Sequence, residues 1–375
     1  MLMALLENEG VVETVAGMLG DKDLLTLSQC CRGTRFLTWW VRSAFWGWAT
    51  AEEAAAARGQ GMPMLERLTV TEDVDGDGTT ALERLIEESH LFPRLKHLDL
   101  EETDTMEAGV LGGLTKLTTL RSMVLCKRTP DWPDLRVDAE GYVEDGEKIL
   151  DESVVAAACA LPIEELTFPM VDTYERGEQV LPVIHSTTIR RYDASNVVGG
   201  IHLGVHITQS LPGLPALRVL DVSLSRNLQD HGYNEPNFFN MGVLADAVEA
   251  GVLRGLEELH IDFRYDEDDD RTIRLLQALG YEPVNHALRV LSANGSEFLN
   301  DHTHYDLVFA LRGGLRFLRV LRVAAHYEPA TVTRALARAF HKGFTEIEMS
   351  GHSLTPAVRR ELESRVEEGV LTMKV

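Results

Sequence analysis

Three aspartates near the start of the chain have the spacing of a calcium-binding loop. Asp73, Asp75 and Asp77 occupy alternate positions of an Asp-x-Asp-x-Asp-Gly segment. Carboxylates spaced in this way can converge on one hard cation, because the glycine lets the loop turn sharply. The twelfth loop position is Arg84, however, where such loops carry a bidentate glutamate. We therefore interpret the segment as an acidic turn, with a calcium site as the alternative.

Other clusters of polar residues do not have the composition of an active site. His202 and His206 are spaced to share a helix face, but the sequence around them supplies no third metal ligand. The four cysteines fit neither a zinc site nor a disulfide framework. No serine has the flanking glycines of a nucleophile elbow. We predict that the protein is not an enzyme and that it uses no cofactor.

A repeated apolar motif determines the elements that position these residues. Leu-x-x-Leu-x-Leu, or a version with other apolar residues, returns at intervals of 25 to 43 residues. Self-similarity of this kind is typical of a solenoid, in which each unit buries its apolar face against its neighbours. The copies begin at Leu65, Leu95, Leu120, Ile163, Ile189, Leu217, Leu256, Leu288, Leu318, Phe344 and Val370.

Within one unit the pattern predicts a strand followed by a helix. The last two apolar positions alternate with polar residues, which indicates a strand buried on one side. Between strands the apolar residues change to helical spacing, as in the stretches 80–86 and 331–340. From Leu65 to Val375 the chain resembles the leucine-rich repeat family. The resemblance implies an α/β horseshoe solenoid with parallel strands on its concave face and helices on its convex face.

The repeats depart from the family in one respect. The position that usually holds Asn or Cys after the strand is occupied by Asp73, Thr103, Arg128, Val171, Val197 and Ser225. We therefore predict about eleven irregular repeats over residues 61–375. An ordinary doubly wound sheet is the alternative, although no glycine-rich phosphate turn follows a strand in this sequence.

Residues 1–60 form a second predicted module. Apolar spacing predicts three short helices, the third running from about Gly33 to the alanines at 54–57. Helices ahead of leucine-rich repeats resemble an F-box, whose motif positions match Val15, Leu19, Asp23, Leu24, Cys31, Leu37 and Trp46. The family's Leu-Pro is absent, since Glu7 and Asn8 stand there. The resemblance implies that a Skp-type adaptor contacts Val15, Leu19, Leu24, Leu25 and Cys31. A plain helical cap over the first repeat is the alternative.

The overall charge narrows the classes of partner. The chain has 375 residues and a net charge of −23 at neutral pH. Nucleic acids and anionic membranes bind positive surfaces, so we predict neither as a partner. No apolar run reaches the length of a membrane span, and the adjacent Cys30 and Cys31 suit a reducing compartment. We expect the cytoplasm or the nucleus.

Strand alternation predicts which residues face away from the core. The middle row of the concave face is predicted as Thr69, Asp99, Val124, Thr167, Asp193, Asp221, His260, Ser292, Arg322, Glu348 and Lys374. Acidic residues gather in and beside this row, so a target is expected to contact Asp99, Glu101, Arg191, Asp193, Asp221, His260 and Asp262. Three repeats carry insertions, and the one around Ser223–Asn240 supplies the predicted aromatic anchors Tyr233, Phe238 and Phe239. A polar strand face without a binding role is the alternative.

These features together favour a protein-binding role. The resemblance to F-box proteins with leucine-rich repeats implies a substrate receptor of an SCF-type cullin ubiquitin ligase. In that role the N-terminal helices would bind the adaptor, and the repeats would hold a protein target with a basic segment. The alternative is a non-catalytic scaffold subunit of a stable assembly, in which the N-terminal helices only cap the solenoid.

Overall fold

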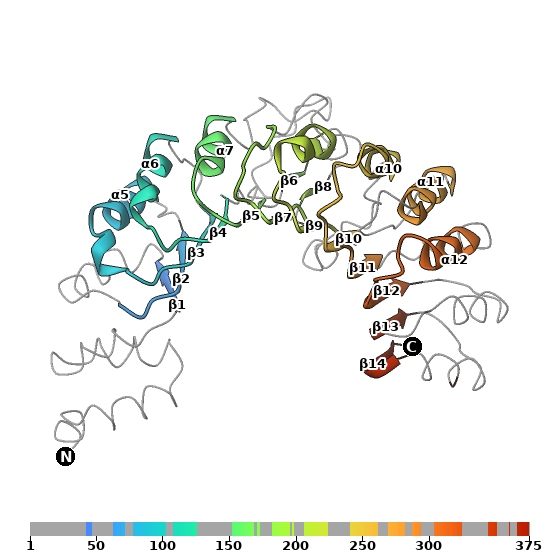
Figure 1. The fold of residues 1–375 in the computed structure, drawn as a ribbon. Helices are drawn as coiled ribbons and strands as arrows, with labels where there is room; N and C mark the ends of the chain where they lie inside the picture. Colours follow the sequence, from blue (N-terminus) through green and yellow to red (C-terminus); the bar gives the residue numbers. More distant parts are fainter. Residues whose placement is uncertain are drawn as a thin grey trace, which may run out of the picture. The chain divides into compact units, whose positions relative to one another are not determined.

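Parallel strands with helices on one side make up the part of the chain that the structure describes (Figure 1). The chain divides into two compact units, Met1–Pro169 and Met170–Val375. The computed structural model describes residues 43–46, 63–71, 78–102, 108–125, 152–168, 171–172, 182–195, 197–198, 206–223, 241–261, 269–281, 287–293, 304–324, 344–350, 360 and 366–374.

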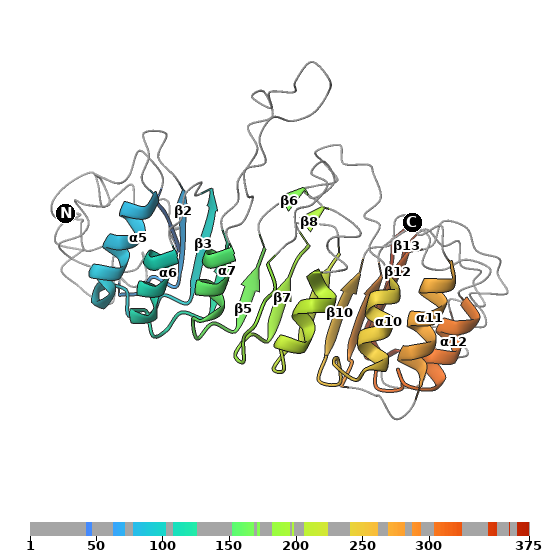
Figure 2. The same ribbon diagram turned by 90° about the horizontal axis from the view of Figure 1, so that it is seen from above.

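Five parallel strands form the sheet of the first unit, and neighbours in sequence are neighbours in space. In order they are β1 (Ser43–Trp46), β2 (Arg67–Thr71), β3 (His97–Glu102), β4 (Ser122–Val124) and β5 (Glu165–Thr167). The connections contain α5 (Gly78–Glu87), η2 (Ser89–Leu91), α6 (Ala108–Gly113), η3 (Leu114–Lys116) and α7 (Glu152–Cys159). The three α-helices lie on one side of the strands (Figure 2).

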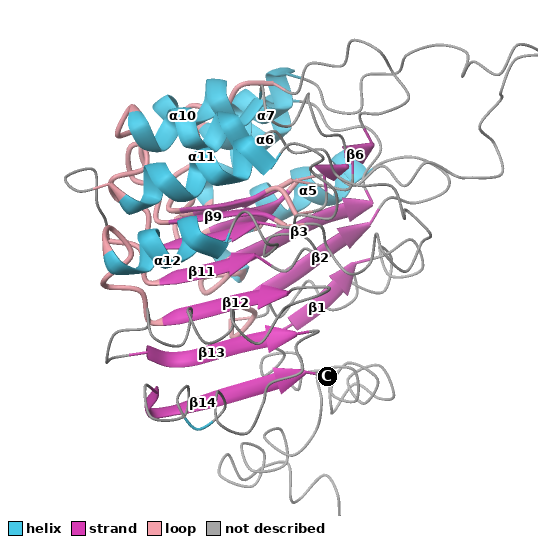
Figure 3. Ribbon diagram, turned by 90° about the vertical axis from the view of Figure 1, so that its right-hand side faces the viewer, coloured by secondary structure: helices cyan, strands magenta, loops and turns pink. Residues whose placement is uncertain are grey.

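The second unit repeats this plan. Its parallel strands are β7 (Arg191–Asp193), β9 (Val219–Val222), β10 (Glu258–Ile261), β11 (Val290–Ala293), β12 (Val320–Ala324), β13 (Phe344–Ser350) and β14 (Val366–Lys374). They lie side by side, and α10 (Met241–Glu249), α11 (Asp269–Gly280) and α12 (His304–Arg312) lie together on one side of them (Figure 3). The unit also contains η4 (Leu211–Gly213) and a small parallel pair, β6 (Val171–Asp172) with β8 (Val197–Val198).

The apolar positions of the repeated motif form the core of each unit, as the sequence predicts. In the second unit the central position of the motif is fully buried in each described copy from β7 to β12, at Tyr192, Leu220, Leu259, Leu291 and Leu321. The first unit has the same row at Leu68, Leu98, Met123 and Leu166. One strand and its connection per motif, with strands parallel, is the α/β architecture of a leucine-rich-repeat solenoid.

Each helix covers the core with one face. Leu244 and Val248 of α10 are buried at a spacing of four residues, which puts them on the same side of the helix. After α10, Gly251 has a φ of 73°, a left-handed conformation that glycine adopts without strain. Its N–H donates to the Val248 carbonyl at 2.9 Å, and the next N–H donates to Ala247 at 3.0 Å. These bonds satisfy helix-end carbonyls and turn the chain toward β10.

The structure corrects the predicted third helix of the N-terminal module. Ser43–Trp46 is the strand β1, and it pairs with β2 in parallel, from Ser43 beside Arg67 to Trp46 beside Val70. Aromatic residues favour strands, and the edge of β2 offers hydrogen bonds that no helix makes. The spacing of apolar residues in this segment carries no information about the free edge of β2, so it could not predict the strand. The other residues of the 1–60 module lie outside the described residues, so that module stays a prediction.

The predicted final strand exists, but its register differs. β14 pairs with β13 in parallel, with Ile347 beside Leu371 and Met349 beside Met373. The sequence motif had aligned Ile347 with Met373, so the observed alignment is two residues away. The position in the middle row is therefore Thr372, beside Glu348, and not Lys374. A two-residue slip preserves the alternation of a strand, which is why apolar spacing alone could not exclude it.

Several predicted features fall outside the described residues. They are the aspartates of the calcium-type segment, Asp73, Asp75 and Asp77; the helix over 331–340; the adaptor-contact residues; and the insertion residues Tyr233, Phe238, Phe239 and Asp262.

Candidate functional site

The polar rows predicted for the strand face occur in the second unit. Asp193 of β7 lies beside Asp221 of β9, and Asp221 lies beside His260 of β10. The row continues to Ser292 and Arg322. Because the buried residues of these strands point toward the helices, this row lies on the opposite side. We call that side of the second unit, from β7 to β12, the open strand face.

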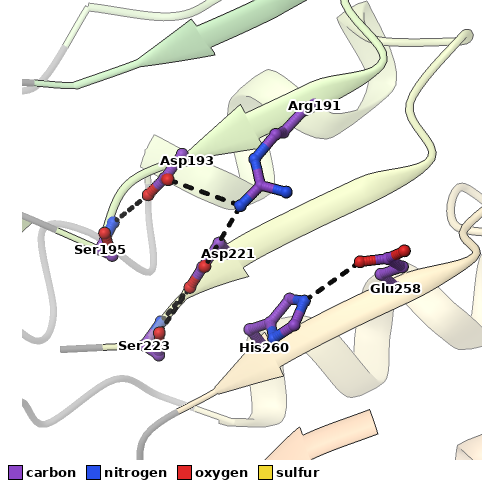
Figure 4. Close-up of polar contacts among 7 residues, drawn as sticks. All are labelled: Arg191, Asp193, Ser195, Asp221, Ser223, Glu258 and His260. Atoms are coloured by element: carbon purple, nitrogen blue, oxygen red, sulfur yellow. Dashed lines mark hydrogen bonds and ion pairs between the residues drawn. The ribbon is translucent and has the colours of Figure 1, made fainter. Parts of the chain in front are cut away.

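Two carboxylates and one guanidinium form a cluster of charge on the open strand face. Arg191 lies two residues before Asp193 on β7, so both side chains are on the same side of the strand. Its Nη2 atom is 3.8 Å from Oδ2 of Asp193 and 3.9 Å from Oδ2 of Asp221 (Figure 4). Only 17% of the Asp193 side chain and 14% of the Asp221 side chain are exposed. One cation is therefore shared between two partly buried anions.

Backbone and hydroxyl donors fix both carboxylates. Oδ1 of Asp193 accepts the N–H of Ser195 at 3.0 Å. Oδ1 of Asp221 accepts the N–H of Ser223 at 3.1 Å and its hydroxyl at 2.6 Å. Each bond closes a local turn two residues long at the end of a strand. The same Asp-x-Ser sequence produces the same arrangement in two consecutive repeats, and this is a signal that the sequence carries.

The surroundings of Asp221 disfavour its ionised form. Burial raises the pKa of its carboxyl above the usual value, and the neighbouring charge of Asp193 raises it further. The hydrogen bonds from Ser223 and the proximity of His260 act in the opposite direction but do not cancel the rise. Hydrogen bonds therefore hold the two carboxylates close together, although their negative charges repel each other.

His260 extends the polar face on the next strand. Its Nε2 atom lies 3.4 Å from Oε2 of Glu258 on the same strand, and only 16% of its side chain is exposed. Glu258 lies beside Val219 and Val290 in the adjacent row. The three strands β7, β9 and β10 thus present Arg191, two aspartates, a histidine and a glutamate together (Figure 4).

Sequence reasoning missed an apolar row on the same face. Val219, Val290 and Val320 are half-buried and lie in the register row that contains Arg191 and Glu258. They occupy the first outward position of their strands, a row in which Arg191 alone was predicted as a target contact. Alternation would have identified them. They provide apolar contact area beside the carboxylates.

Two predicted residues have other surroundings. Ser292 is 2% exposed, so the middle row is covered at β11. His206, considered as one member of a metal-binding pair, is 1% exposed and its Nε2 lies 2.6 Å from the buried hydroxyl of Tyr192. Tyr192 occupies a leucine position of the motif, so the role of His206 is to form a hydrogen bond with the hydroxyl group of a core residue.

The predicted acidic residues are divided between the two units. The structure brings Asp193, Asp221 and His260 together in the second unit. It places Asp99 and Glu101 on β3 of the first unit, where the register partners of Asp99 are Thr69 and Val124. Among the described residues, no three His, Cys, Asp or Glu side chains are grouped to hold a metal ion. No helix within the described ranges has the length and apolar character needed to cross a membrane.

Comparisons with known proteins give structural likeness alone. No protein-family model matches the chain. No curated protein matches it either. A solved structure of an internalin (inlF) from Listeria monocytogenes is 12% identical, with a TM-score of 0.35 and 94% of each chain covered. A solved structure of a Bacteroides fragilis protein is 12% identical, with a TM-score of 0.38, covering 87% of this chain and 73% of that one. Similarity at this level assigns neither a family nor a function.

Proposed function

We propose that the protein is a non-catalytic protein-interaction module that binds a basic segment of a target on its open strand face. The observation that supports this most is the pair Asp193 and Asp221, with Arg191 shared between them at 3.8 and 3.9 Å. When both carboxylates are ionised, one guanidinium leaves one negative charge uncompensated. A Lys or Arg from a partner would supply the missing cation.

A cationic partner would gain binding free energy by relieving the repulsion between the two carboxylates. Burial and the charge of Asp193 raise the pKa of Asp221, so ionised Asp221 is disfavoured in the free protein. A bound cation would lower that pKa and would release whatever proton Asp221 carried. At pH values below the pKa of Asp221 the negative charge is lost, and binding of a basic segment weakens. Val219 and Val290 would contact the apolar part of the same segment.

Residues beyond the open strand face complete the proposed target surface. Asp262, Tyr233, Phe238 and Phe239 follow strands of the second unit in sequence, where they would supply a further charge and aromatic anchors. Asp99 and Glu101, on β3 of the first unit, are proposed as target contacts of that unit by itself. Charge on this surface would act mainly on the association rate, whereas buried aromatic anchors would slow dissociation.

A selection on the full chain tests the proposal. Peptides enriched from a random displayed library should carry an excess of Lys and Arg, and their association should slow as salt rises. The double variant Asp193→Asn with Asp221→Asn should weaken their binding by about 10- to 100-fold. A matched control, Asp246→Asn, removes a 59% exposed carboxylate from α10 and should have little effect. No basic enrichment, or a loss below about threefold in the double variant, would refute the proposal.

The finer role is that of a substrate receptor of an SCF-type cullin ubiquitin ligase. It rests on the resemblance of residues 1–60 to an F-box, and the adaptor contacts would be Val15, Leu19, Leu24, Leu25 and Cys31. Calorimetry of the full chain with a purified Skp-type adaptor should detect binding that Leu19→Asp with Leu24→Asp removes. If the unaltered chain gives no binding at about tens of micromolar while basic peptides still bind, the chain is a scaffold subunit and not a receptor.

A further inference from the structure

Arginines mark the edge of the second unit at which the strands begin. Arg218, Arg289 and Arg319 each stand directly before a strand, and backbone bonds place them in sequence along the edge. Glu257 lies between the first two, and its Oε1 is 3.8 Å from Nε of Arg218. Arg289 and Arg319 are direct neighbours, since the Arg319 N–H donates to the Arg289 carbonyl at 2.8 Å. Among the described residues of this edge, positive charge therefore predominates at β11 and β12, although the net charge of the chain is −23.

An exposed phenylalanine lies within this positive charge. Phe317 precedes β12 and is 49% exposed. The guanidinium carbon of Arg289 is 5.3 Å from the centre of its ring, and that of Arg316 is 4.9 Å away. At these distances the negative face of the ring attracts both guanidinium groups. Two positive charges thus lie beside one exposed ring.

Two more aromatic rings lie at the same edge. α11 and α12 run back toward the edge where β11 and β12 begin, so Tyr281 after α11 and Phe309 in the last turn of α12 lie toward this edge. Their ring centres are 6.1 Å apart in an edge-to-face arrangement, and the side chains are 61% and 47% exposed. The Gly314 N–H donates to the Gly280 carbonyl at 3.0 Å, which ties the two helix ends together. We call the six residues Tyr281, Arg289, Phe309, Arg316, Phe317 and Arg319 the basic aromatic edge.

We infer that the basic aromatic edge is a second docking surface, which binds an acidic polypeptide segment carrying an aromatic or aliphatic side chain. Carboxylates of the segment would pair with the guanidinium groups of Arg289 and Arg316, and its apolar side chain would pack on the exposed rings. Arginine and aromatic residues are enriched among the residues that dominate binding energy at protein interfaces. A nucleic acid carries a negative charge at every phosphate along its length, so the net charge of −23 repels it more strongly than a short segment with a few carboxylates.

This surface is independent of the proposed open strand face. It has the opposite charge and lies at the ends of the coils, whereas the carboxylate pair lies on the strands β7 and β9. A partner could present a basic segment to one surface and an acidic segment to the other, or two partners could bind together. Failure of either proposal leaves the other intact.

A display selection with the full chain tests the inference. Peptides rich in Asp, Glu and an aromatic residue should be enriched as a class separate from basic peptides. The double variant Arg289→Gln with Arg316→Gln should weaken the acidic class by about tenfold or more, and Phe317→Ala should raise its dissociation rate. The control Arg94→Gln with Arg121→Gln removes the same charge from exposed positions of the first unit and should leave binding unchanged. Circular dichroism and the melting temperature of each variant verify folding.

Three results would overturn the inference. One is a selection without an acidic class, or an acidic class whose affinity is the same for the double variant and the control. Another is tighter binding of a labelled single-stranded oligonucleotide than of any selected peptide, with loss in the same double variant. The last is a dimer in sedimentation equilibrium that dissociates in the double variant, since the occupant would then be a second copy of the chain.

Discussion

Replacing Asp221 by asparagine should stabilise the protein at neutral pH, and the gain should disappear in acid. Asparagine keeps a side-chain oxygen that can accept the bonds from Ser223 at 2.6 and 3.1 Å. It removes a charge whose side chain is only 14% exposed. The substitution therefore separates the geometry of the site from its electrostatics.

Two opposing Coulomb terms nearly cancel at this position. Attraction between Asp221 and Arg191, 3.9 Å apart, is about 4 kcal/mol at an effective dielectric constant of about 20, and solvent at the 36% exposed Arg191 reduces it. Carboxylates on neighbouring strands, roughly 5 Å apart, repel by about 3 kcal/mol on the same scale. The free-energy cost of burying the carboxylate then makes ionised Asp221 destabilising overall. Replacing it by a neutral side chain should therefore stabilise the folded protein by about 1–2 kcal/mol.

The pH dependence follows from the direction of the pKa shift. The pKa of Asp221 is raised in the folded state above its ordinary value of 3.8. Between those two values the folded state holds the proton more tightly, so the wild-type protein loses stability as pH rises through this window. The advantage of Asp221→Asn should be full above the folded pKa and absent below the ordinary value.

Urea unfolding over a pH series measures this difference. The unfolding midpoint of Asp221→Asn should exceed that of the wild type at pH 7, and the two should converge in acid. Asp246→Asn, at an exposed ion pair on α10, should change stability by less than about 1 kcal/mol. If Asp221→Asn is destabilising at pH 7, or if its effect is the same at every pH, the electrostatic description of the carboxylate pair is wrong.

Three further predictions concern the fold that carries the site. Tyr192→Phe should lower the free energy of unfolding by about 1–3 kcal/mol, because it leaves buried His206 without the hydroxyl 2.6 Å from its Nε2; an unchanged urea midpoint would contradict this. Gly313→Ala should lower the melting temperature, because the added Cβ would meet the carbonyl oxygen of Gly280. The control Gly109→Ala adds a Cβ in open space on α6 and should raise the free energy of unfolding by about 0.5–1 kcal/mol. Deleting β14 should expose the edge of β13 and reduce the melting temperature, and an equal melting temperature would show that β14 adds nothing to the sheet.

Some of the fold follows directly from the sequence. Apart from the short pair β6 and β8, the strands from β2 to β12 lie where the repeated motif predicts, because burial on one side of a strand requires an alternation that the order of apolar and polar residues reveals. The same alternation places Asp193, Asp221 and His260 on one side of their strands. Their mutual contact also follows, because successive copies of a motif in a solenoid stack in register.

Other features depended on the tertiary structure. The strand at Ser43–Trp46 required the open edge of β2, which local spacing does not contain. The register of β14 required its pairing with β13, since a slip of two residues leaves the alternation unchanged.

The chemistry of the candidate site also came from packing in three dimensions. The sequence identified Asp221 as an outward acid, but only its burial beside Asp193 raises its pKa. No pattern in the sequence groups Tyr281 with Phe309, or Arg289 with Phe317. They meet because helix ends and strand starts share one edge in every coil, a consequence of how the coils stack and not of any local pattern.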